Sequence, residues 1–327
     1  MTDQRERDGR EILVTDSLFI DQNNVEELER AGFRVTRLDK PEATEAELCE
    51  AVKGKSGYIL GGIERVTKKV IDSADRLEAI VFAGSAYAEF IPAWKDATAK
   101  GIAIGNAPGA NASSVAEYTV TLSLAMLRNV FELGRTGTKK FQTTRSLRDA
   151  TFGIVGLGKT GTEVARLLKA LGTKEVLYYS KTRKADAEKK LSIKYAELDE
   201  LLGKSDVVTL HVPITVGKNF IDADKLRKMK DGSILIDVAN AELVDFDALK
   251  SEIKAGRLRA AYDAPPHRDY GDIPPWQFFA SNMQTAYNTI DANATTSSMV
   301  TKTIVNLLKT GSDKYLVNPE YKSNRKR

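Results

Sequence analysis

The feature that most constrains this chain is a repeated alternation of short apolar segments with helical patterns. In the first hundred residues the apolar segments are EILVTD, SGYILGG, LEAIVFAG and GIAIGNAPG, and helical stretches such as NVEELERAGF and KKVIDSAD lie between them. Strands separated by helices of this length need crossover connections. The alternation therefore predicts mostly parallel sheet covered by helices.

A second series of the same kind follows an interruption. One long helical pattern spans Ala112 to Leu133, and a polar segment, GRTGTKKFQTTRSLRDA, comes after it. The new series then reads TFGIVGLG, VLYYS, IKYAEL, DVVTLHVP, GSILIDVA and LRAAYDA. We therefore predict an α/β fold with two doubly wound parallel-sheet domains, one formed by residues 1–105 with 286–327 and the other by residues 106–285. The last helical pattern, ATTSSMVTKTIVNLLKTG, is expected to return to the first domain.

Composition narrows the class of protein. The 327 residues carry 29% charged side chains and a net charge of +4, a mixed surface that argues against a nucleic-acid or membrane partner. A single cysteine, Cys49, excludes an intramolecular disulfide and a cysteine-built zinc site, and we predict no metal. No apolar run approaches the roughly 20 residues that span a bilayer. The first ten residues are too charged for a secretory signal. We expect a cytoplasmic protein and a frayed basic tail, YKSNRKR.

A glycine motif supplies the strongest functional signal. Gly156, Gly158 and Gly161 have the spacing G-x-G-x-x-G directly after an apolar strand and at the start of an amphipathic helix. In this context the first glycine permits a tight turn, the second lets the backbone approach a pyrophosphate, and the third lets helix and strand pack closely. The helix N-terminus presents free N–H groups to the anion. We predict a dinucleotide site that includes Leu157, Lys159 and Thr160.

The end of the next strand indicates which dinucleotide is preferred. An acidic residue that binds the ribose 2′-hydroxyl normally lies about 20 residues beyond the glycines. The chain instead has Ser180, Lys181, Thr182 and Arg183, which offer hydroxyls and cations to a 2′-phosphate. The run favours NADP(H), with NAD(H) possible. The alternative interpretation of this run is that it is only the solvated start of the next helix.

With these residues in place, the chain resembles the D-isomer-specific 2-hydroxyacid dehydrogenases. The resemblance rests on GNAPGANASSVAEYT, TFGIVGLGKTG, SDVVTLHVPIT, LRKMKDGSILIDVANAELVDFDAL and YLVNPE, and it covers nearly the whole chain. It implies that a flavodoxin-like domain carries a small-molecule substrate, that a Rossmann-like domain carries the dinucleotide, and that the reaction takes place between them. It also implies a homodimer, for which the Ala112–Leu133 helix is an interface candidate or else part of the core.

The resemblance assigns further cofactor positions. Asp263 matches the residue that fixes the nicotinamide amide, although a helix cap or a turn residue is an alternative for it. The remaining positions match the loop beneath the adenosine and diphosphate and the surroundings of the nicotinamide ribose: His211, Val212, Pro213 and Thr215, then Val238 and Ala239.

The catalytic positions of the family are changed. Asn240 stands where the family has a substrate-binding Arg, and an amide supplies no charge for a 2-keto acid. Pro266 replaces the Glu that holds the catalytic His; His267 or Asp269 could substitute only if the loop shifts. Tyr287 falls at the position of the His, while a second alignment places Gln284 there. We predict Tyr287, Asn240 and Gln284 as the candidate catalytic residues.

The substrate loop is altered as well. By resemblance, Gly84, Ser85, Ala86 and Tyr87 form the turn whose backbone grips the substrate carboxylate. Ala86 replaces a glycine and could forbid a positive φ there. Ser85 and Tyr87 add hydroxyls that could serve another ligand or be ordinary loop residues.

Three functions remain open at this point. The first is an NADP(H)-dependent oxidoreductase that transfers hydride to or from a carbonyl, alcohol or imine not anchored by Arg. The second is a catalytically silent dinucleotide-binding sensor or interaction protein. The third is a non-redox enzyme, of the lyase or hydratase type, on the same scaffold.

Overall fold

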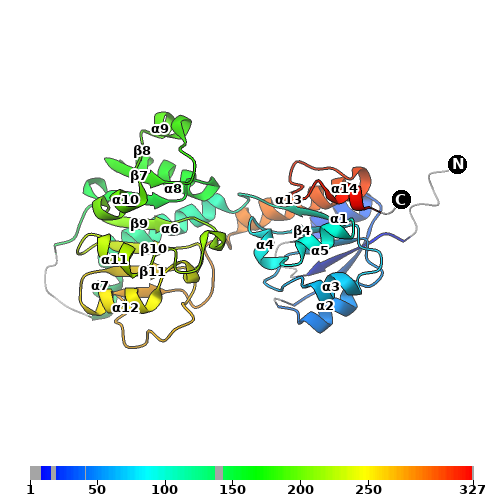
Figure 1. The fold of residues 1–327 in the computed structure, drawn as a ribbon, viewed down its shortest axis with the longest axis horizontal. Coiled ribbons are helices and arrows are strands. Elements are labelled where there is room, and N and C mark those ends of the chain that lie inside the picture. The colour runs from blue at the N-terminus through cyan, green and yellow to red at the C-terminus, as the bar shows by residue number, and fades with distance from the viewer. Residues whose placement is uncertain (1–8, 16–19, 41, 137–142, 326–327) are drawn as a thin grey trace. The chain divides into compact units, whose positions relative to one another are not determined.

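The computed structural model describes residues 9–15, 20–40, 42–136 and 143–325. The chain divides into two compact units (Figure 1). Unit 1 comprises Met1–Asn111 and Thr289–Arg327, and unit 2 comprises Ala112–Asn288. Both divisions fall a few residues later than the expected boundaries after residues 105 and 285. Ala107 N donates to Gly84 O at 2.9 Å within unit 1, and Asp263 Oδ1 accepts from Ala286 N at 3.0 Å within unit 2.

Unit 1 contains a parallel five-stranded sheet with the order β2-β1-β3-β4-β5, the flavodoxin-like order. Its strands are β1 (Glu11–Thr15), β2 (Arg34–Leu38), β3 (Gly57–Leu60), β4 (Ala79–Phe82) and β5 (Ala103–Asn106). Its helices are α1 (Gln22–Arg30), α2 (Glu45–Ala51), α3 (Lys68–Ser73), α4 (Tyr87–Phe90), α5 (Trp94–Ala99), α13 (Ile290–Thr310) and α14 (Tyr321–Asn324). Leu13 faces the apolar cluster with α2, α3 and α5, while Ile12 and Val14 face the cluster with α1 and α13. Both faces of this sheet are therefore buried.

The C-terminal segment is packed onto unit 1. Tyr321 is only 1% exposed, and its hydroxyl donates to Gly311 O at 2.7 Å. Arg325 forms an ion pair with Glu78. The expectation of a frayed tail is therefore wrong as far as Arg325, because a buried ring and an ion pair hold this segment; the last two residues lie outside the described part of the chain.

Unit 2 contains a parallel seven-stranded sheet with the order β12-β11-β10-β9-β6-β7-β8. Its strands are β6 (Thr151–Val155), β7 (Glu175–Tyr179), β8 (Lys194–Tyr195), β9 (Val207–Leu210), β10 (Ile234–Asp237), β11 (Arg259–Tyr262) and β12 (Phe278–Ala280). Its helices are α6 (Ala112–Leu127), α7 (Val130–Thr136), α8 (Lys159–Ala170), α9 (Ala185–Leu191), α10 (Leu198–Lys204), α11 (Ala223–Lys228) and α12 (Phe246–Lys254), with 3-10 turns at Leu147–Asp149, Ile214–Val216 and Ala241–Leu243. This is the Rossmann order, so the predicted pair of doubly wound domains is confirmed.

The long helix expected over residues 112–133 is two helices, which corrects the sequence-based prediction. Asn129 lies between α6 and α7 with a left-handed φ of 53°, a conformation that asparagine tolerates better than most residues. The apolar residues of α6, including Ala116, Val120 and Met126, belong to the core of unit 2. The α6 stripe therefore packs inside its own unit.

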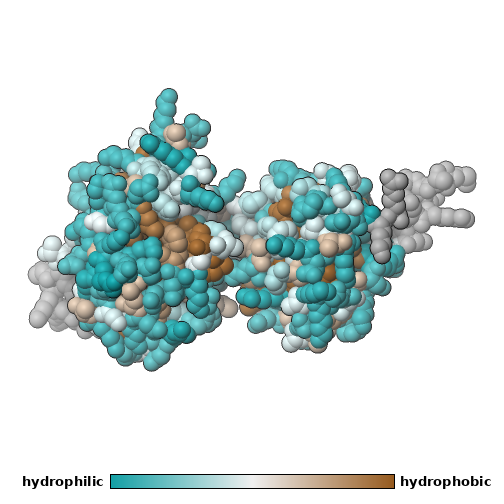
Figure 2. Space-filling view, viewed as in Figure 1, coloured by the Kyte–Doolittle hydropathy of each residue, from teal (hydrophilic) through white to brown (hydrophobic). Residues whose placement is uncertain are grey.

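The visible surface is mainly hydrophilic, as expected for a chain with 29% charged residues. On the face shown in Figure 2, apolar side chains appear only in patches on each unit. Among the described residues, no helix is both long enough and apolar enough to cross a membrane.

Candidate dinucleotide and active site

The turn between β6 and α8 has the geometry of a phosphate-binding loop. Gly156 has a φ of +101°, and a Cβ on it would lie 2.7 Å from His211 O. A Cβ on Gly161 would lie 2.0 Å from Gly156 O, so α8 can approach the strand this closely only with glycine there. A Cβ on Gly158 would meet no heavy atom within 4 Å. Gly158 is also the N-cap of α8, so this open space adjoins the start of a 12-residue helix whose first N–H groups have no partner within the helix.

This turn lies at the topological switch point of the sheet. β6 pairs with β7 on one side and with β9 on the other, and ligands of doubly wound folds bind where the strand order reverses. Leu157 is buried in the core, while Lys159 and Thr160 begin α8. The turn, the helix terminus and the open space fit a pyrophosphate.

The loop after β9 borders the glycine turn. His211 N donates to Val155 O at 2.8 Å, and its Nε2 lies 3.1 Å from Thr209 Oγ1. Burial lowers the pKa of His211 to about 3, so its ring is neutral at physiological pH. Val212 is half-buried and Pro213 is exposed, and Thr215 lies in the following 3-10 turn. The neutral His211 ring therefore adds no charge beside the glycine turn.

The basic run after β7 is organised by a carboxylate that the sequence analysis did not single out. Glu188 accepts two hydrogen bonds from Arg183, each 2.8 Å long, and one from the Tyr178 hydroxyl at 2.7 Å. The bond from Arg183, followed by that from Tyr178, lowers the pKa of Glu188 to about 2. The Arg183 guanidinium also lies 5.8 Å from the centre of the Tyr195 ring. One of the two cations expected to bind a 2′-phosphate, Arg183, is therefore held by an internal anion.

The other residues of the run are differently placed. Ser180 Oγ donates to Thr182 O at 2.6 Å, which makes a tight turn at the end of the strand. Lys181 and Thr182 are exposed. Among the described residues, the Lys181 ammonium has no carboxylate within ion-pair distance. Lys181 is thus the more available cation of the run.

The ends of β10 and β11 each carry a buried carboxylate. Asp237 is 3% exposed, and its Oδ1 accepts from Ala239 N at 2.8 Å and from Asn240 N at 3.2 Å. Burial raises the pKa of Asp237 to about 7, and the charge of Asp263 adds to this effect. Val238 is buried and Ala239 half-buried. Asp237 therefore fixes the loop that carries Asn240.

The side-chain oxygen of Asn240 is engaged in a hydrogen bond within that loop. Its Oδ1 accepts from Glu242 N at 3.0 Å and caps the 3-10 turn Ala241–Leu243. Donation to a substrate would come from the amide nitrogen.

Asp263 holds the turn that contains Tyr287. Asp263 is 2% exposed, and its Oδ1 accepts from Thr285 N at 2.9 Å and from Ala286 N at 3.0 Å. Burial raises the pKa of this carboxyl, and the two backbone donors oppose that shift. Tyr287 is half-buried, whereas Gln284 is exposed. The structure thus connects Asp263 with the Tyr287 turn, a relationship that the sequence did not indicate.

In the described segment 266–272, which begins with the Pro266 that the sequence aligns with the family glutamate, no acidic side chain is buried. Pro266 is buried, and His267 and Asp269 are exposed. Asp269 Oδ1 accepts from Gly271 N at 3.0 Å. Neither His267 nor Asp269 occupies a buried catalytic position in this structure.

In unit 1, the loop Gly84–Tyr87, for which a substrate role is predicted, needs no left-handed residue at Ala86. Ala86 has a φ of −87°, so its backbone is not in the left-handed region that would favour glycine. Ser85 is exposed, and its Oγ accepts from Gly109 N at 3.2 Å. The Tyr87 ring packs edge-on against Trp94, with centroids 6.1 Å apart. A Cβ on Gly84 would lie 2.7 Å from the Phe82 ring. Gly84 is therefore required by packing.

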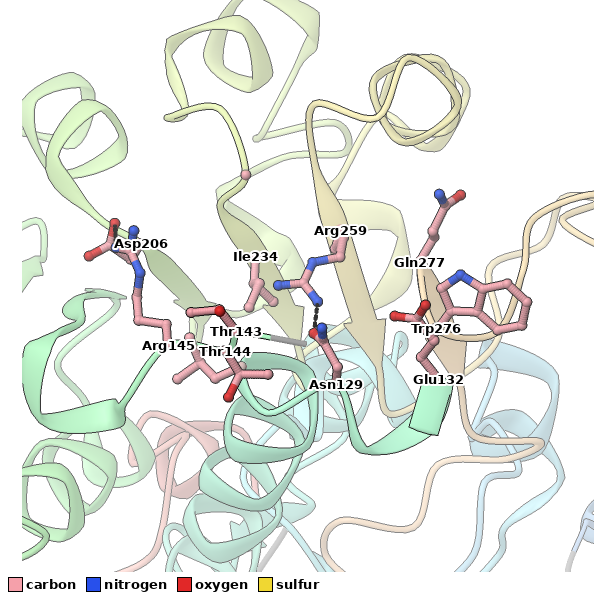
Figure 3. A pocket seen from close by; sticks show the side chains of 12 residues that line it. Asn129, Glu132, Thr143, Thr144, Arg145, Asp206, Ile234, Arg259, Trp276 and Gln277 are labelled. Atoms are coloured by element: carbon pink, nitrogen blue, oxygen red, sulfur yellow. Dashed lines mark hydrogen bonds and ion pairs between the residues drawn. The ribbon is translucent and has the colours of Figure 1, made fainter. Parts of the chain in front are cut away.

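A cavity of about 480 Å³ lies at the opposite, amino edge of the unit 2 sheet (Figure 3). Arg259, at the start of β11, donates to Asn129 Oδ1 at 2.8 Å across it, and Asp206 on another wall pairs with Arg145. The glycine turn follows the carboxyl end of β6, so this cavity is separate from the dinucleotide site.

Comparison with known proteins identifies the family. Residues 120–278 match the NAD-binding domain of the D-isomer specific 2-hydroxyacid dehydrogenases. A glyoxylate reductase of Thermofilum pendens is 30% identical over 290 residues, which are 84% of each chain. The NAD⁺-bound 3-phosphoglycerate dehydrogenase of Entamoeba histolytica superimposes with a TM-score of 0.82 at 22% identity, covering 95% of this chain and 99% of that one. An acyclic imino acid reductase in complex with NADPH and D-Arg superimposes with a TM-score of 0.81 at 21% identity, covering 94% and 99%.

The chain therefore belongs to the D-isomer-specific 2-hydroxyacid dehydrogenase family. This places it among oxidoreductases that use a nicotinamide dinucleotide.

Proposed function

We propose that this protein is an NADP(H)-dependent oxidoreductase that transfers hydride to or from a carbonyl, alcohol or imine not anchored by Arg. The observation that carries the proposal is the β6–α8 turn, which leaves open space only at Gly158 among its three motif glycines. That opening faces a helix N-terminus, where a pyrophosphate is stabilised by N–H groups and the helix dipole.

The preference for NADP(H) is supported by the loop after β7. Lys181 offers an exposed cation, and Arg183 would bind a 2′-phosphate if it loosened its ion pair with Glu188. No carboxylate stands at Ser180, where one would repel that phosphate. Because Glu188 competes for Arg183, we expect a moderate preference with NAD(H) still accepted. The imino acid reductase with this fold binds NADPH.

The chemistry that we propose assigns Tyr287 as the proton donor and Asn240 as the group that orients the substrate. When bound, the dinucleotide supplies or accepts the hydride. A tyrosine hydroxyl can protonate a developing alkoxide if a relay delivers the proton or its pKa is lowered from about 10. Gln284, the other residue proposed at this position, is exposed in the structure, which favours Tyr287. Asn240 donates without charge, so the substrate need not be a 2-keto acid.

A silent dinucleotide sensor is the second candidate. It is favoured by the engagement of Asn240 Oδ1 within its own loop and by the buried proline at the family glutamate position. The homodimer, the cytoplasmic location and the substrate role of Gly84–Tyr87 stay predictions.

Titration of NADPH and NADH into the protein, followed by nicotinamide fluorescence, tests the proposal. Each reduced dinucleotide is then offered with a panel of aldehydes, ketones, imines and keto acids. We expect tighter binding of NADPH and turnover of a carbonyl or imine. Tight binding without any turnover would favour the sensor, and absence of binding by either dinucleotide would overturn the proposal.

A further inference from the structure

Arg259 is a half-buried cation at the start of β11. Its Nη1 donates to Met126 O at 3.0 Å and to Asn129 Oδ1 at 2.8 Å. In the described part of the chain, no carboxylate lies within ion-pair distance of Arg259, and its Nε and Nη2 have no hydrogen-bond partner. Burial lowers the pKa of Arg259, and the charge of Glu132 opposes that shift. The guanidinium is therefore fixed in place while its charge is only partly compensated.

Two other arginines show the contrast. Arg257, two residues earlier in the chain, forms an ion pair with Glu252 at 2.6 Å. Arg145, which lines the same cavity as Arg259, pairs with Asp206. Each of these two cations has a carboxylate partner within the protein. Arg259 is thus the one of the three whose guanidinium can take an external anion without breaking an ion pair to a described residue.

Arg259 lines the cavity of about 480 Å³ shown in Figure 3. In that view one terminal nitrogen of its guanidinium is bonded to Asn129, and the other is directed away from Asn129. Thr143 and Thr144, which carry hydroxyl groups, and the indole ring of Trp276 also line the cavity. The cavity therefore combines a planar pair of N–H donors with further polar side chains and an aromatic wall.

These groups favour a small carboxylate with a single charge. The Nε and Nη2 of an arginine match the two oxygens of a carboxylate, and such bidentate pairs are among the stronger hydrogen-bonded contacts in proteins. Among the described residues that line the cavity, Glu132 and Asp206 balance the charges of Arg145 and Arg259. A second negative charge on the ligand, as on phosphate, would therefore add repulsion that a monocarboxylate avoids.

We propose that the cavity at the amino edge of the unit 2 sheet is a binding site for a small organic monocarboxylate. The Nε–Nη2 edge of Arg259 holds the carboxylate, and the apolar part of the ligand lies against Trp276. The glycine turn follows the carboxyl end of β6, at the opposite edge of the same sheet, so the carboxylate and the dinucleotide bind at separate places. The site is additional to the proposed function and does not depend on it.

The two tryptophans of the chain provide a reporter for this cavity. Trp276 lines it, whereas Trp94 begins α5 in unit 1. The full-length variant Trp94→Phe keeps only the indole of Trp276, and Trp276→Phe keeps only that of Trp94. Sodium propionate should change the fluorescence of Trp94→Phe saturably, with a dissociation constant on the order of 1 mM for so small a ligand. Trp276→Phe should not respond, and sodium chloride at equal ionic strength controls for salt.

Further ligands and variants test the chemistry of the contact. Propionamide has nearly the shape of propionate without its charge, and it should bind at least about tenfold more weakly, as should inorganic phosphate. In the Trp94→Phe background, Arg259→Lys keeps the charge but loses the two-nitrogen edge, so it should weaken propionate binding by about tenfold. Arg257→Lys is the matched control and should leave propionate affinity unchanged. Urea unfolding shows whether each variant is folded.

Several results would overturn the site. These are equal binding of propionate and propionamide, tighter binding of phosphate than of propionate, a response of Trp276→Phe equal to that of Trp94→Phe, or unchanged affinity in Arg259→Lys. If Arg259→Lys does not fold, crystals of the unaltered protein soaked with 4-bromobenzoate decide the question. Anomalous bromine density beside Arg259 and Trp276 would support the site, whereas bromine only elsewhere, or none, would overturn it.

Discussion

Arg183 and Glu188 form a two-bond ion pair at the end of the second strand of the dinucleotide-binding unit, with both N–O distances at 2.8 Å. The arginine that would otherwise be free for a 2′-phosphate is thus held by a carboxylate five residues later. The pair is exposed on the arginine side, so water and salt weaken it. We therefore propose that cofactor choice depends on competition between this carboxylate and the phosphate.

Glu188→Gln should raise the selectivity for NADPH over NADH. Removing the carboxylate charge releases Arg183, and one charge-assisted contact to a phosphate is worth about tenfold in affinity. Lys181→Ala should lower the same ratio by a similar factor, and Lys189→Ala on α9 is the control. Dissociation constants for both dinucleotides at one ionic strength provide the measurement; an effect from Lys189→Ala equal to that from Lys181→Ala would indicate general surface charge instead of a phosphate site.

Ser180→Asp combined with Arg183→Ala should move the preference toward NADH. The new carboxylate can accept from a ribose 2′-hydroxyl and repels a 2′-phosphate. The ratio of the two dissociation constants is the readout. An unchanged ratio would mean that the basic run is only solvated surface.

The motif glycines should respond differently to alanine. Gly161→Ala places a methyl 2.0 Å from Gly156 O, so the helix must move and stability should fall by about 1–3 kcal/mol or more. Gly158→Ala meets no atom within 4 Å, so the fold should survive while dinucleotide affinity drops. Denaturant unfolding and fluorescence titration of both variants measure the two effects. Unimpaired NADPH binding by Gly158→Ala would place the pyrophosphate elsewhere.

Tyr287→Phe should abolish most of the turnover of whichever substrate is found, because only the hydroxyl is removed. General acid catalysis contributes about 10²–10⁴-fold, which sets the expected loss in kcat. Gln284→Ala is the matched control three residues earlier and should change kcat little. The reverse result, with Gln284→Ala the more damaging variant, would transfer the role to Gln284.

Ordinary 2-keto acids should be poor substrates. Pyruvate, glyoxylate and hydroxypyruvate need a cation at the position of Asn240, whose amide oxygen already caps a 3-10 turn. Steady-state kinetics with NADPH should give kcat/KM well below about 10⁴ M⁻¹s⁻¹ for each. A value above that limit for any of them would show that our interpretation of Asn240 is wrong.

Asp237 should make the folded state less stable as the pH rises toward neutrality. Its pKa is about 7 in the folded protein against 3.8 normally, so the folded state binds the extra proton between these values. The contribution is fully present below about pH 4 and lost as the pH rises through 7, on the order of a few kcal/mol. His211 has the opposite effect: because its pKa falls from 6.5 to about 3 in the folded protein, its contribution makes the folded state more stable as the pH rises between these values.

The difference between the unaltered protein and Asp237→Asn isolates the carboxyl. Urea unfolding at pH 5 and pH 8 should show a smaller loss, or a gain, of unfolding free energy with rising pH in the variant. Parallel pH dependence in the two proteins would mean that Asp237 titrates normally in the folded state.

The sequence alone determined the two parallel sheets and the dinucleotide turn. Most of the strands that it predicted, such as β6 and β9, are apolar runs buried on both faces, and this pattern can be seen within each run. The glycine motif is local too, because the three glycines lie within the six residues Gly156 to Gly161. Strands β2 and β12 were missed, since each lies at a sheet edge and β2 reads RVTRL, with charged residues where a central strand would be apolar.

Tertiary structure decided which polar groups meet. Glu188 lies beside Arg183 and Tyr178 only because α9 folds back over β7, and Asp263 reaches Thr285 and Ala286 only because β11 ends beside a turn 22 residues later. The sequence shows where a carboxylate lies along the chain, but it does not show whether the carboxylate is buried or which groups it contacts. Those depend on how the chain folds around the carboxylate, over ten residues at Glu188 and over 22 at Asp263, and they decide whether the carboxylate binds a ligand, holds a loop or neutralises a cation.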